Sequence, residues 1–303
     1  MSAVNDTKLN SAVFLLTGIP GQEDVHLWIS VPFCLMYVIS IVGNSVILFI
    51  IKTDPGLHEP MYIFLSMLAV TDLDLSISSM LTTLGIFLFN SREISLNACF
   101  AQLFFIHVLK YTESSVLLLM AFDRFIAIHD PLRYASILTL PRIAKMGLVC
   151  ALRGVALILP IPFLLQRFQY CRANVLSHCC CLKQEVMKMA CSDIRVNSIY
   201  GLLVTIFTVW LDSLLIFLSY VMILKTVLSI TSHAECLRAL NTCVSQLCAV
   251  LLSYTPMIGL SNVPLHFHVL IANVYLLMPL VLNPIIYARP LGQGKGSALK
   301  LGG

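Results

Sequence analysis

The chain has 303 residues, of which 58% are hydrophobic and only 11% are charged. An ordinary soluble domain contains about 25% charged residues, so this composition excludes a soluble globular protein and indicates a membrane protein. The net charge of +4 is small, and the basic residues lie at the ends of apolar runs, so no nucleic-acid partner is expected. The eleven cysteines lack the spacing of a metal site.

Residues 1–26 are expected to form an extracellular amino terminus. They contain no basic start followed by an apolar run, so no cleavable signal peptide is expected. Asn5 begins an Asn-x-Thr sequon, which predicts a glycosylation site on the extracellular side.

Seven apolar runs of about 20 residues predict an all-α membrane protein with seven spanning helices. The predicted spans are residues 27–51, 59–84, 98–122, 143–165, 197–224, 240–261 and 267–287. The short connections after spans one, three and five are basic, which places them in the cytosol and the amino terminus outside. The predicted organisation is therefore a seven-transmembrane domain at 27–288 and a cytoplasmic tail at 289–303.

The third span runs directly into charged residues, in the stretch MAFDRFIAIHDPLRYA at 120–135. Asp123 and Arg124 are adjacent where the apolar helix reaches the membrane edge. A charge there needs either a counter-ion or water, so Arg124 can be held by Asp123 in one state and released toward a partner in another. This pair predicts a conformational switch.

Several polar residues lie inside the predicted spans. A charged group near the middle of a bilayer costs roughly 2.5–3.5 kcal/mol on insertion scales, so each such group needs a partner or a function. These residues are Asn44, Asp72, Glu113, Asp212 and Asn283.

Five ordered blocks of the sequence resemble those of vertebrate olfactory receptors, which are rhodopsin-like G-protein-coupled receptors. The blocks are PMYIFLSMLAVTDL (60–73), MAFDRFIAIHDPLRY (120–134), LSYVMIL (218–224), LRALNTCVSQL (237–247) and LNPIIY (282–287). The stretches FFIH, LNTCVSQ and YTPMIGLS resemble the fish-like class I subgroup most closely.

The resemblance covers nearly the whole chain and implies a rhodopsin-like seven-helix bundle without enzymatic activity. It implies a multi-pass receptor in plasma-membrane lipid, which binds a small odorant-like molecule among spans three, five, six and seven. It also implies activation of a heterotrimeric G protein of the stimulatory olfactory type, which raises cyclic AMP.

The same resemblance assigns a role to each switch residue. It makes Arg124 the coupling residue and Asp123 its holder in the inactive state, and it makes Tyr220 and Tyr287 approach Arg124 in the active state. Pro256 is the expected pivot of span six. Because a proline removes a backbone hydrogen bond, a static kink without motion is the alternative for Pro256.

A buried polar cluster is also implied, formed by Asn44, Asp72 and the Asn283-Pro284 pair, with Glu113 facing Asp72. Two carboxylates in one dry site repel, so we expect a shared proton or a bound Na+ at Asp72 and Glu113. The alternative is a hydrogen-bonded contact between helices that does not switch. No other cofactor is expected.

Two disulfides are implied outside the membrane, where the environment is oxidising. Cys99 matches the partner of Cys181, and Cys171 matches the partner of Cys191. The run at 179–181 contains two additional cysteines, which leave the pairing within this loop open.

The ligand prediction starts from a missing cation. The class I pattern has a His-Arg-Phe before span seven that is absent here, whereas span three carries an unusual Lys110. His107, Lys110 and Ser114 share one helical face, because they recur at i, i+3 and i+7. The predicted ligand-binding residues are His107, Lys110, Tyr111, Ser114, Tyr254 and Ser261.

Two alternatives concern Lys110 and the protein as a whole. Lys110 either binds an anionic or acceptor-rich ligand, or pairs with Glu113 three residues later and replaces the Na+. The third extracellular loop is short, and Pro290 and several glycines disfavour a helix in the tail. The alternative to a working receptor is therefore a receptor-like relic with impaired folding or signalling. A transporter would show internal repeats, which are not visible.

Overall fold

The computed structural model describes residues 13–16, 26–89, 92–170, 175–176, 181, 183–228, 274 and 276–287. Its longer helices are α1 (His26–Thr53), α2 (Pro60–Phe89), α3 (Leu96–His129), α5 (Leu140–Ile158), α8 (Arg195–Thr205) and α9 (Leu211–Leu228). The shorter ones are η3 (Pro55–Leu57), α4 (Tyr134–Ile137), α6 (Pro160–Gln166), α7 (Lys183–Lys188) and the π-helical turn η4 (Ile206–Trp210). The strands are β1 (Val13–Leu16), β2 (Glu93–Ser95) and β3 (Val175–Leu176).

Five helical segments of the described chain are long and apolar enough to cross a membrane, and they correspond to the first five predicted spans. These segments are Ser30–Thr53, Pro60–Phe89, Leu96–His129, Leu140–Gln166 and Arg195–Thr226. The predicted sixth span lies outside the described residues. The seventh is described in part, as the apolar helix Leu276–Tyr287.

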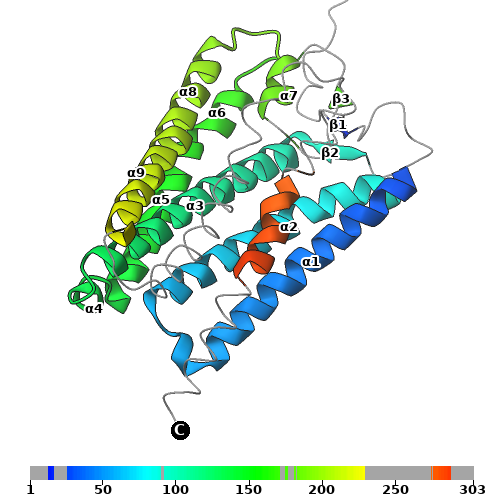
Figure 1. Cartoon of the computed structure of the whole chain (residues 1–303). Helices are drawn as coiled ribbons and strands as arrows, with labels where there is room; N and C mark the ends of the chain where they lie inside the picture. The colour runs from blue at the N-terminus through cyan, green and yellow to red at the C-terminus, as the bar shows by residue number, and fades with distance from the viewer. Residues whose placement is uncertain are drawn as a thin grey trace, which may run out of the picture.

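Helix α3 lies at the centre of the described bundle, where it contacts α2, α5, α6 and α9 (Figure 1). Helix α1 packs along α2. The helix Leu276–Tyr287, orange in Figure 1, lies near α1, because Asn44 Nδ2 donates a hydrogen bond to Leu280 O over 3.2 Å. Many large apolar side chains point outward from these helices, among them Trp28, Phe49, Phe163 and Phe217. Such a surface is suited to lipid.

Helix α3 is longer than the predicted third span, which ended at residue 122. It continues to His129, and the backbone N–H of Asp130 donates to Ile126 O over 2.9 Å as a cap. The following Pro131 disfavours a helical conformation at Asp130, so the helix ends there. Asp123 and Arg124 therefore lie on a regular helix, which continues beyond the apolar run that predicts the third span.

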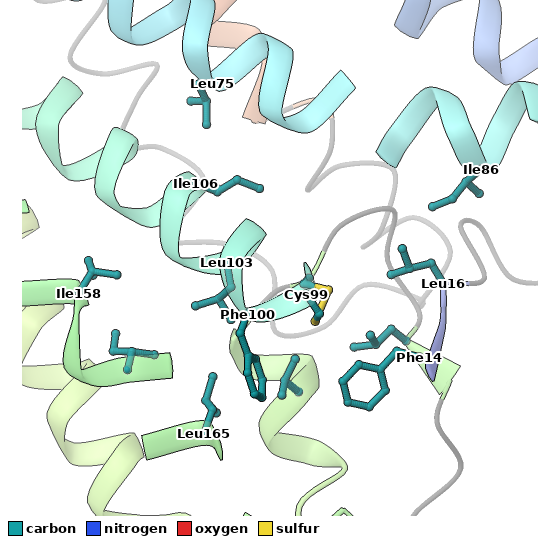
Figure 2. Close-up of a cluster of buried hydrophobic side chains, with 14 of the residues drawn as sticks. Phe14, Leu16, Leu75, Ile86, Cys99, Phe100, Leu103, Ile106, Ile158 and Leu165 are labelled. Carbon is teal, nitrogen blue, oxygen red and sulfur yellow. A yellow bond between two sulfur atoms is a disulfide. The ribbon is translucent and has the colours of Figure 1, made fainter. Parts of the chain in front are cut away.

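A three-stranded sheet with the order β2-β1-β3 was not predicted from the sequence. Strand β1 pairs antiparallel with β2 and parallel with β3, at the end of the bundle that also holds α7 (Figure 1). Phe14 and Leu16 of β1 are buried, whereas Leu15 between them is exposed, which is the alternation of a strand with one covered face. Figure 2 shows Phe14 and Leu16 in the same apolar cluster as Phe100 of α3.

The buried apolar residues form two clusters, separated along the helices by polar residues. On α1, Phe33 and Tyr37 belong to the first cluster, which includes β1, and Ile47 and Ile51 belong to the second. The buried Asn44 lies between these pairs in sequence. Helix α3 repeats this order along the chain with Glu113 in the intermediate position, whereas α2 runs from the second cluster to the first with Asp72 between them. The bundle thus has a polar layer between two apolar halves.

Candidate functional site

Asp123 and Arg124, near the end of α3, form an ion pair. Arg124 Nη2 lies 3.1 Å from Asp123 Oδ2, and the Asp123 side chain has no exposed surface. The hydroxyl of Tyr134, in α4, donates a hydrogen bond to Asp123 Oδ1 over 2.7 Å. Oδ1 of this carboxylate therefore accepts a hydrogen bond, Oδ2 lies beside the Arg124 guanidinium, and the described conformation holds Arg124 against its own helix.

Tyr134 was missed as a functional candidate, although it belongs to the stretch singled out at 120–135. Burial and the nearby Asp123 carboxylate raise the pKa of the Tyr134 hydroxyl above its usual value. The phenol therefore keeps its proton and stays a donor at neutral pH. The signal available in the sequence was its place eleven residues after Asp123, but the turn that brings it back was not predictable.

The two tyrosines assigned to the switch lie in the second apolar cluster with Met120, one turn before Arg124. Tyr220 and Tyr287 are both buried. The Tyr287 hydroxyl has no hydrogen-bond partner among the described residues, and it interacts electrostatically with Arg124. Pro256, the third switch residue, lies outside the described part of the chain.

The polar layer joins helices that are distant in sequence. Asn283 Nδ2 donates to Asp72 Oδ2 over 2.9 Å, and Asn44 Nδ2 donates to the carbonyl of Leu280. Pro284 approaches α1 closely, because a Cβ atom on Gly43 would lie 2.7 Å from the Pro284 ring. Glycine at this position therefore permits the contact.

The charges of the polar layer are partly neutralised within the chain. Lys110 Nζ lies 2.9 Å from Glu113 Oε2, which is the geometry of the second alternative considered for Lys110. Asp72 Oδ1 is buried and has no hydrogen-bond partner among the described residues. That oxygen is suited to a proton or to Na+, whereas Glu113 already has a cation beside it.

The predicted ligand-binding residues of α3 also have partners within the protein. His107 Nδ1 lies 2.8 Å from Leu103 O, and Ser114 Oγ donates to Asp212 Oδ2 over 3.0 Å. Tyr111 is half-buried against the first apolar cluster. Tyr254 and Ser261 lie outside the described residues.

Asp212 has a partner that the sequence analysis did not identify. Arg153 Nη1 of α5 lies 2.9 Å from Asp212 Oδ1 and donates to Ser115 Oγ over 3.2 Å. Arg153 Nη2 donates to Phe207 O, in the π-helical turn, over 2.9 Å. This network joins α3, α5 and α9. An arginine inside the predicted fourth span indicates that it needs an acidic partner. The sequence did not identify Asp212 as that partner, because the two residues are far apart along the chain.

The disulfide between Cys99 and Cys181 is present, with the two Cα atoms 5.4 Å apart, and this prediction is confirmed. Figure 2 shows it at the first turns of α3. Cys191 is also disulfide-bonded. Cys171, its predicted partner, lies outside the described residues, as does Asn5.

A bundle of spanning helices with a disulfide-anchored loop at one end of α3 and an Asp-Arg pair at the other has the architecture of a membrane receptor. A family model described as olfactory receptor matches residues 33–294. Olfactory receptor 51G2 of Homo sapiens is 60% identical over 291 residues, which cover 94% of this chain and 93% of that protein. Olfactory receptor 51A7 of Homo sapiens is 56% identical over 295 residues, covering 95% and 93%.

The chain belongs to the olfactory receptor family. The relatives place it in the class I group, so the predicted family and subgroup are confirmed. It has the seven-transmembrane, rhodopsin-like fold of that family, it is a multi-pass plasma-membrane protein, and it is not an enzyme. The transporter alternative is thereby removed.

Proposed function

We propose that this protein is an odorant receptor that binds a small molecule within the helix bundle and activates a heterotrimeric G protein of the stimulatory olfactory type, raising cyclic AMP. The observation that carries the proposal is the ion pair between Asp123 and Arg124, together with the hydrogen bond that Tyr134 donates to the same carboxylate. A half-buried Arg held by a neighbouring buried carboxylate at a helix end can be released without any covalent step. Its release is the conformational change that a G protein would detect.

The ligand acts by shifting a pre-existing equilibrium between two helix arrangements. It changes their populations only by the difference between its affinities for them, so its contacts must differ between the two states. We place the ligand beside His107, Tyr111 and Ser114 of α3, with Tyr254 and Ser261 completing the site. Lys110 remains a candidate contact only in a state that releases it from Glu113.

A sodium ion is a proposed regulator of the same equilibrium. Asp72 Oδ1 is the described acceptor that fits it, and Glu113 is the second predicted carboxylate. The cation would reduce the repulsion between buried carboxylates. Because Lys110 already supplies a positive charge to Glu113, we expect Na+ to act mainly through Asp72.

The amino terminus is proposed to lie outside the cell, with Asn5 glycosylated. The sheet of β1, β2 and β3 and the disulfide Cys99–Cys181 gather at one end of α3, and Arg124 lies at the other. If Arg124 is cytosolic, the sheet and the disulfide are extracellular. Membrane lipid covers the outward apolar side chains, and nucleic acid is not proposed as a partner.

Replacing Arg124 by Ala tests the proposal. The variant should reach the cell surface and keep ligand-induced thermal stabilisation, but lose the cyclic AMP response to a panel of small acids, alcohols, aldehydes and ketones. Arg142→Ala is the control, because Arg142 is an exposed cation whose side chain donates to the backbone carbonyls of Ser136 and Ile137. It should leave the response nearly unchanged.

An undiminished cyclic AMP response in Arg124→Ala would reject the coupling role. A wild-type receptor that reaches the surface but neither signals nor is stabilised by any panel member would support the relic alternative instead.

A further inference from the structure

Asp74 is an acidic residue at the midpoint of a spanning helix. Helix α2 runs from Pro60 to Phe89, so position 74 lies about 20 Å from either end of the helix. The Asp74 side chain is exposed on the surface of the bundle. Acidic residues at this depth of a membrane are costly, and they almost always face the interior of a bundle or a water-filled cavity. An outward carboxylate here therefore calls for an explanation.

Asp74 does not belong to the polar layer. Asp72 is buried and accepts a hydrogen bond from Asn283, whereas two further residues turn the helix by about 200°, to its opposite side. Ser78 Oγ donates to the backbone carbonyl of Asp74 over 2.7 Å. Among the described residues, none forms an ion pair with the Asp74 side chain or donates a hydrogen bond to it. A partner for this carboxylate would come from the lipid side.

The residues that flank Asp74 form an outward apolar stripe with the spacing of a contact between helices. Val70 and Ile77 are each 47% exposed, and Leu81 is 70% exposed. The intervals from position 70 to 74, 77 and 81 alternate between four and three residues, as they do along the seam of paired helices. A polar residue at one position of such a seam fixes the register of the partner helix.

Gly85 lies on the same outward face, three turns after Asp74. A Cβ atom at Gly85 would meet no atom within 4 Å, whereas one at Gly43 would lie 2.7 Å from the Pro284 ring. No contact among the described residues therefore requires glycine at position 85. Small residues on the outer face of a spanning helix allow the backbone of a second helix to approach closely. Gly85 thus indicates a helix partner independently of the charge.

The charge of Asp74 selects the kind of partner. Two copies of this stripe facing each other would bring two carboxylates together, and like charges repel. The cations near the middle of the described spans, Lys110 and Arg153, already pair with Glu113 and Asp212. The sequence contains no Lys or Arg at 239–288, where spans six and seven are predicted. A second copy of this chain therefore supplies no unpaired mid-span cation, and lipid head groups lie at the membrane surfaces, far from Asp74.

We propose that this face of α2 binds a transmembrane helix of another protein, and that the partner helix carries a lysine or arginine near the middle of its span. The cation pairs with Asp74, which neutralises both charges where water is absent. Apolar residues of the partner cover the stripe at Val70, Ile77 and Leu81, and its backbone approaches α2 near Gly85. The proposal does not depend on odorant binding or on the G protein.

The test uses designed helices as probes of the purified full-length receptor in phosphatidylcholine liposomes. Each probe is a leucine- and alanine-rich peptide of about 20 residues with lysine, leucine or glutamate at its centre, and a fourth carries the lysine near one end. Energy transfer from the labelled receptor to the labelled peptide gives the dissociation constant. The central-lysine peptide should bind about 5- to 30-fold more tightly than the leucine peptide, the range for a polar contact between helices in a membrane. The other two peptides should show no such gain.

Asp74→Leu should reduce binding of the central-lysine peptide to the value of the leucine peptide. Asp74→Asn, which keeps the shape of the side chain, provides the same test if Asp74→Leu does not fold. Asp193→Asn is the matched control, because Asp193 is an exposed aspartate outside the spans that pairs with Arg195 at 3.9 Å, and its affinity should stay at the wild-type value. Gly85→Leu should weaken binding of the central-lysine peptide by blocking the approach of its backbone.

The proposal is overturned if the lysine and leucine peptides bind equally, or if the preference for lysine persists in Asp74→Leu and Asp74→Asn. Energy transfer between two differently labelled receptors would identify self-association. If the Asp74 variants abolished that transfer while the lysine peptide showed no preference, the face would instead be a contact between copies of this chain, contrary to the proposal.

Discussion

The ion pair between Arg153 and Asp212 predicts a large effect on stability when only one partner is removed. Arg153 Nη1 lies 2.9 Å from one carboxylate oxygen and 3.2 Å from the other. The Asp212 side chain is 2% exposed and that of Arg153 is 30% exposed. In Arg153→Met, the carboxylate keeps its hydrogen bond from Ser114 but loses its counter-charge in a poorly polar environment.

Breaking a buried ion pair by removing one partner costs about 3–5 kcal/mol. Because Ser114 still donates to the Asp212 carboxylate in the variant, we take the lower end, about 3 kcal/mol, which is roughly a hundredfold change in the folding equilibrium. At roughly 2–4 °C per kcal/mol for a chain of a few hundred residues, the unfolding temperature should fall by roughly 6–12 °C. The carbonyl of Phe207 also loses its donor, which adds to the effect.

The assay is thermal unfolding of the purified receptor in nanodiscs. Arg195→Ala is the control, since Arg195 forms an exposed pair with Asp193 at 3.9 Å, and exposed pairs contribute about 0–1 kcal/mol. The double variant Arg153→Met with Asp212→Leu should recover most of the loss, because replacing both partners of a buried pair with apolar residues is often neutral. A single variant no less stable than the control, or a double variant that is simply additive, would refute this reasoning.

Two further predictions concern the polar layer and the disulfide. Lys110→Ser should lower surface expression by leaving Glu113 without its cation, and adding Glu113→Gln should restore it, as measured by surface immunostaining; no recovery would contradict the pairing. Cys181→Ser should cause the same intracellular retention as Cys99→Ser. In the chain-entropy account, a disulfide that joins residues 82 positions apart contributes roughly 4–5 kcal/mol to stability. The control is Cys150→Ser, which should reach the cell surface, because Cys150 is a free cysteine. The disulfide assignment would be contradicted if mass mapping of the non-reduced protein joined Cys99 to another cysteine.

The sequence predicted the spanning helices well because their signal is local. An apolar run of sufficient length must be helical in a bilayer, whatever it contacts. Helix α3 shows where this reasoning stops, since the lipid-like run ends near residue 122 and the helix continues to His129. Hydropathy detects the membrane edge, whereas the end of the helix depends on Pro131 and on the cap at Asp130.

The sheet at the disulfide end could not be predicted, because its strands come from three segments that are distant in sequence. Strand β1 has four residues, β2 has three and β3 has two. An alternation of apolar and polar residues over so few positions is too short to predict a strand from the sequence. Only their mutual pairing makes Phe14 and Leu16 part of the core, and that pairing requires the folded bundle.

The two buried lysine contacts show the same difference between local and long-range signals. Lys110 and Glu113 are three residues apart on one helix, so their pairing was an open alternative from spacing alone, and the structure has that geometry. Lys183 lies in a loop, and sequence reasoning could only count it among the basic residues there. Its burial, its contact with Asn197 and the space over Gly201 depend on the disulfide and on α8. The pair that forms within one helix could therefore be expected from spacing, whereas a contact between a loop and a helix could not.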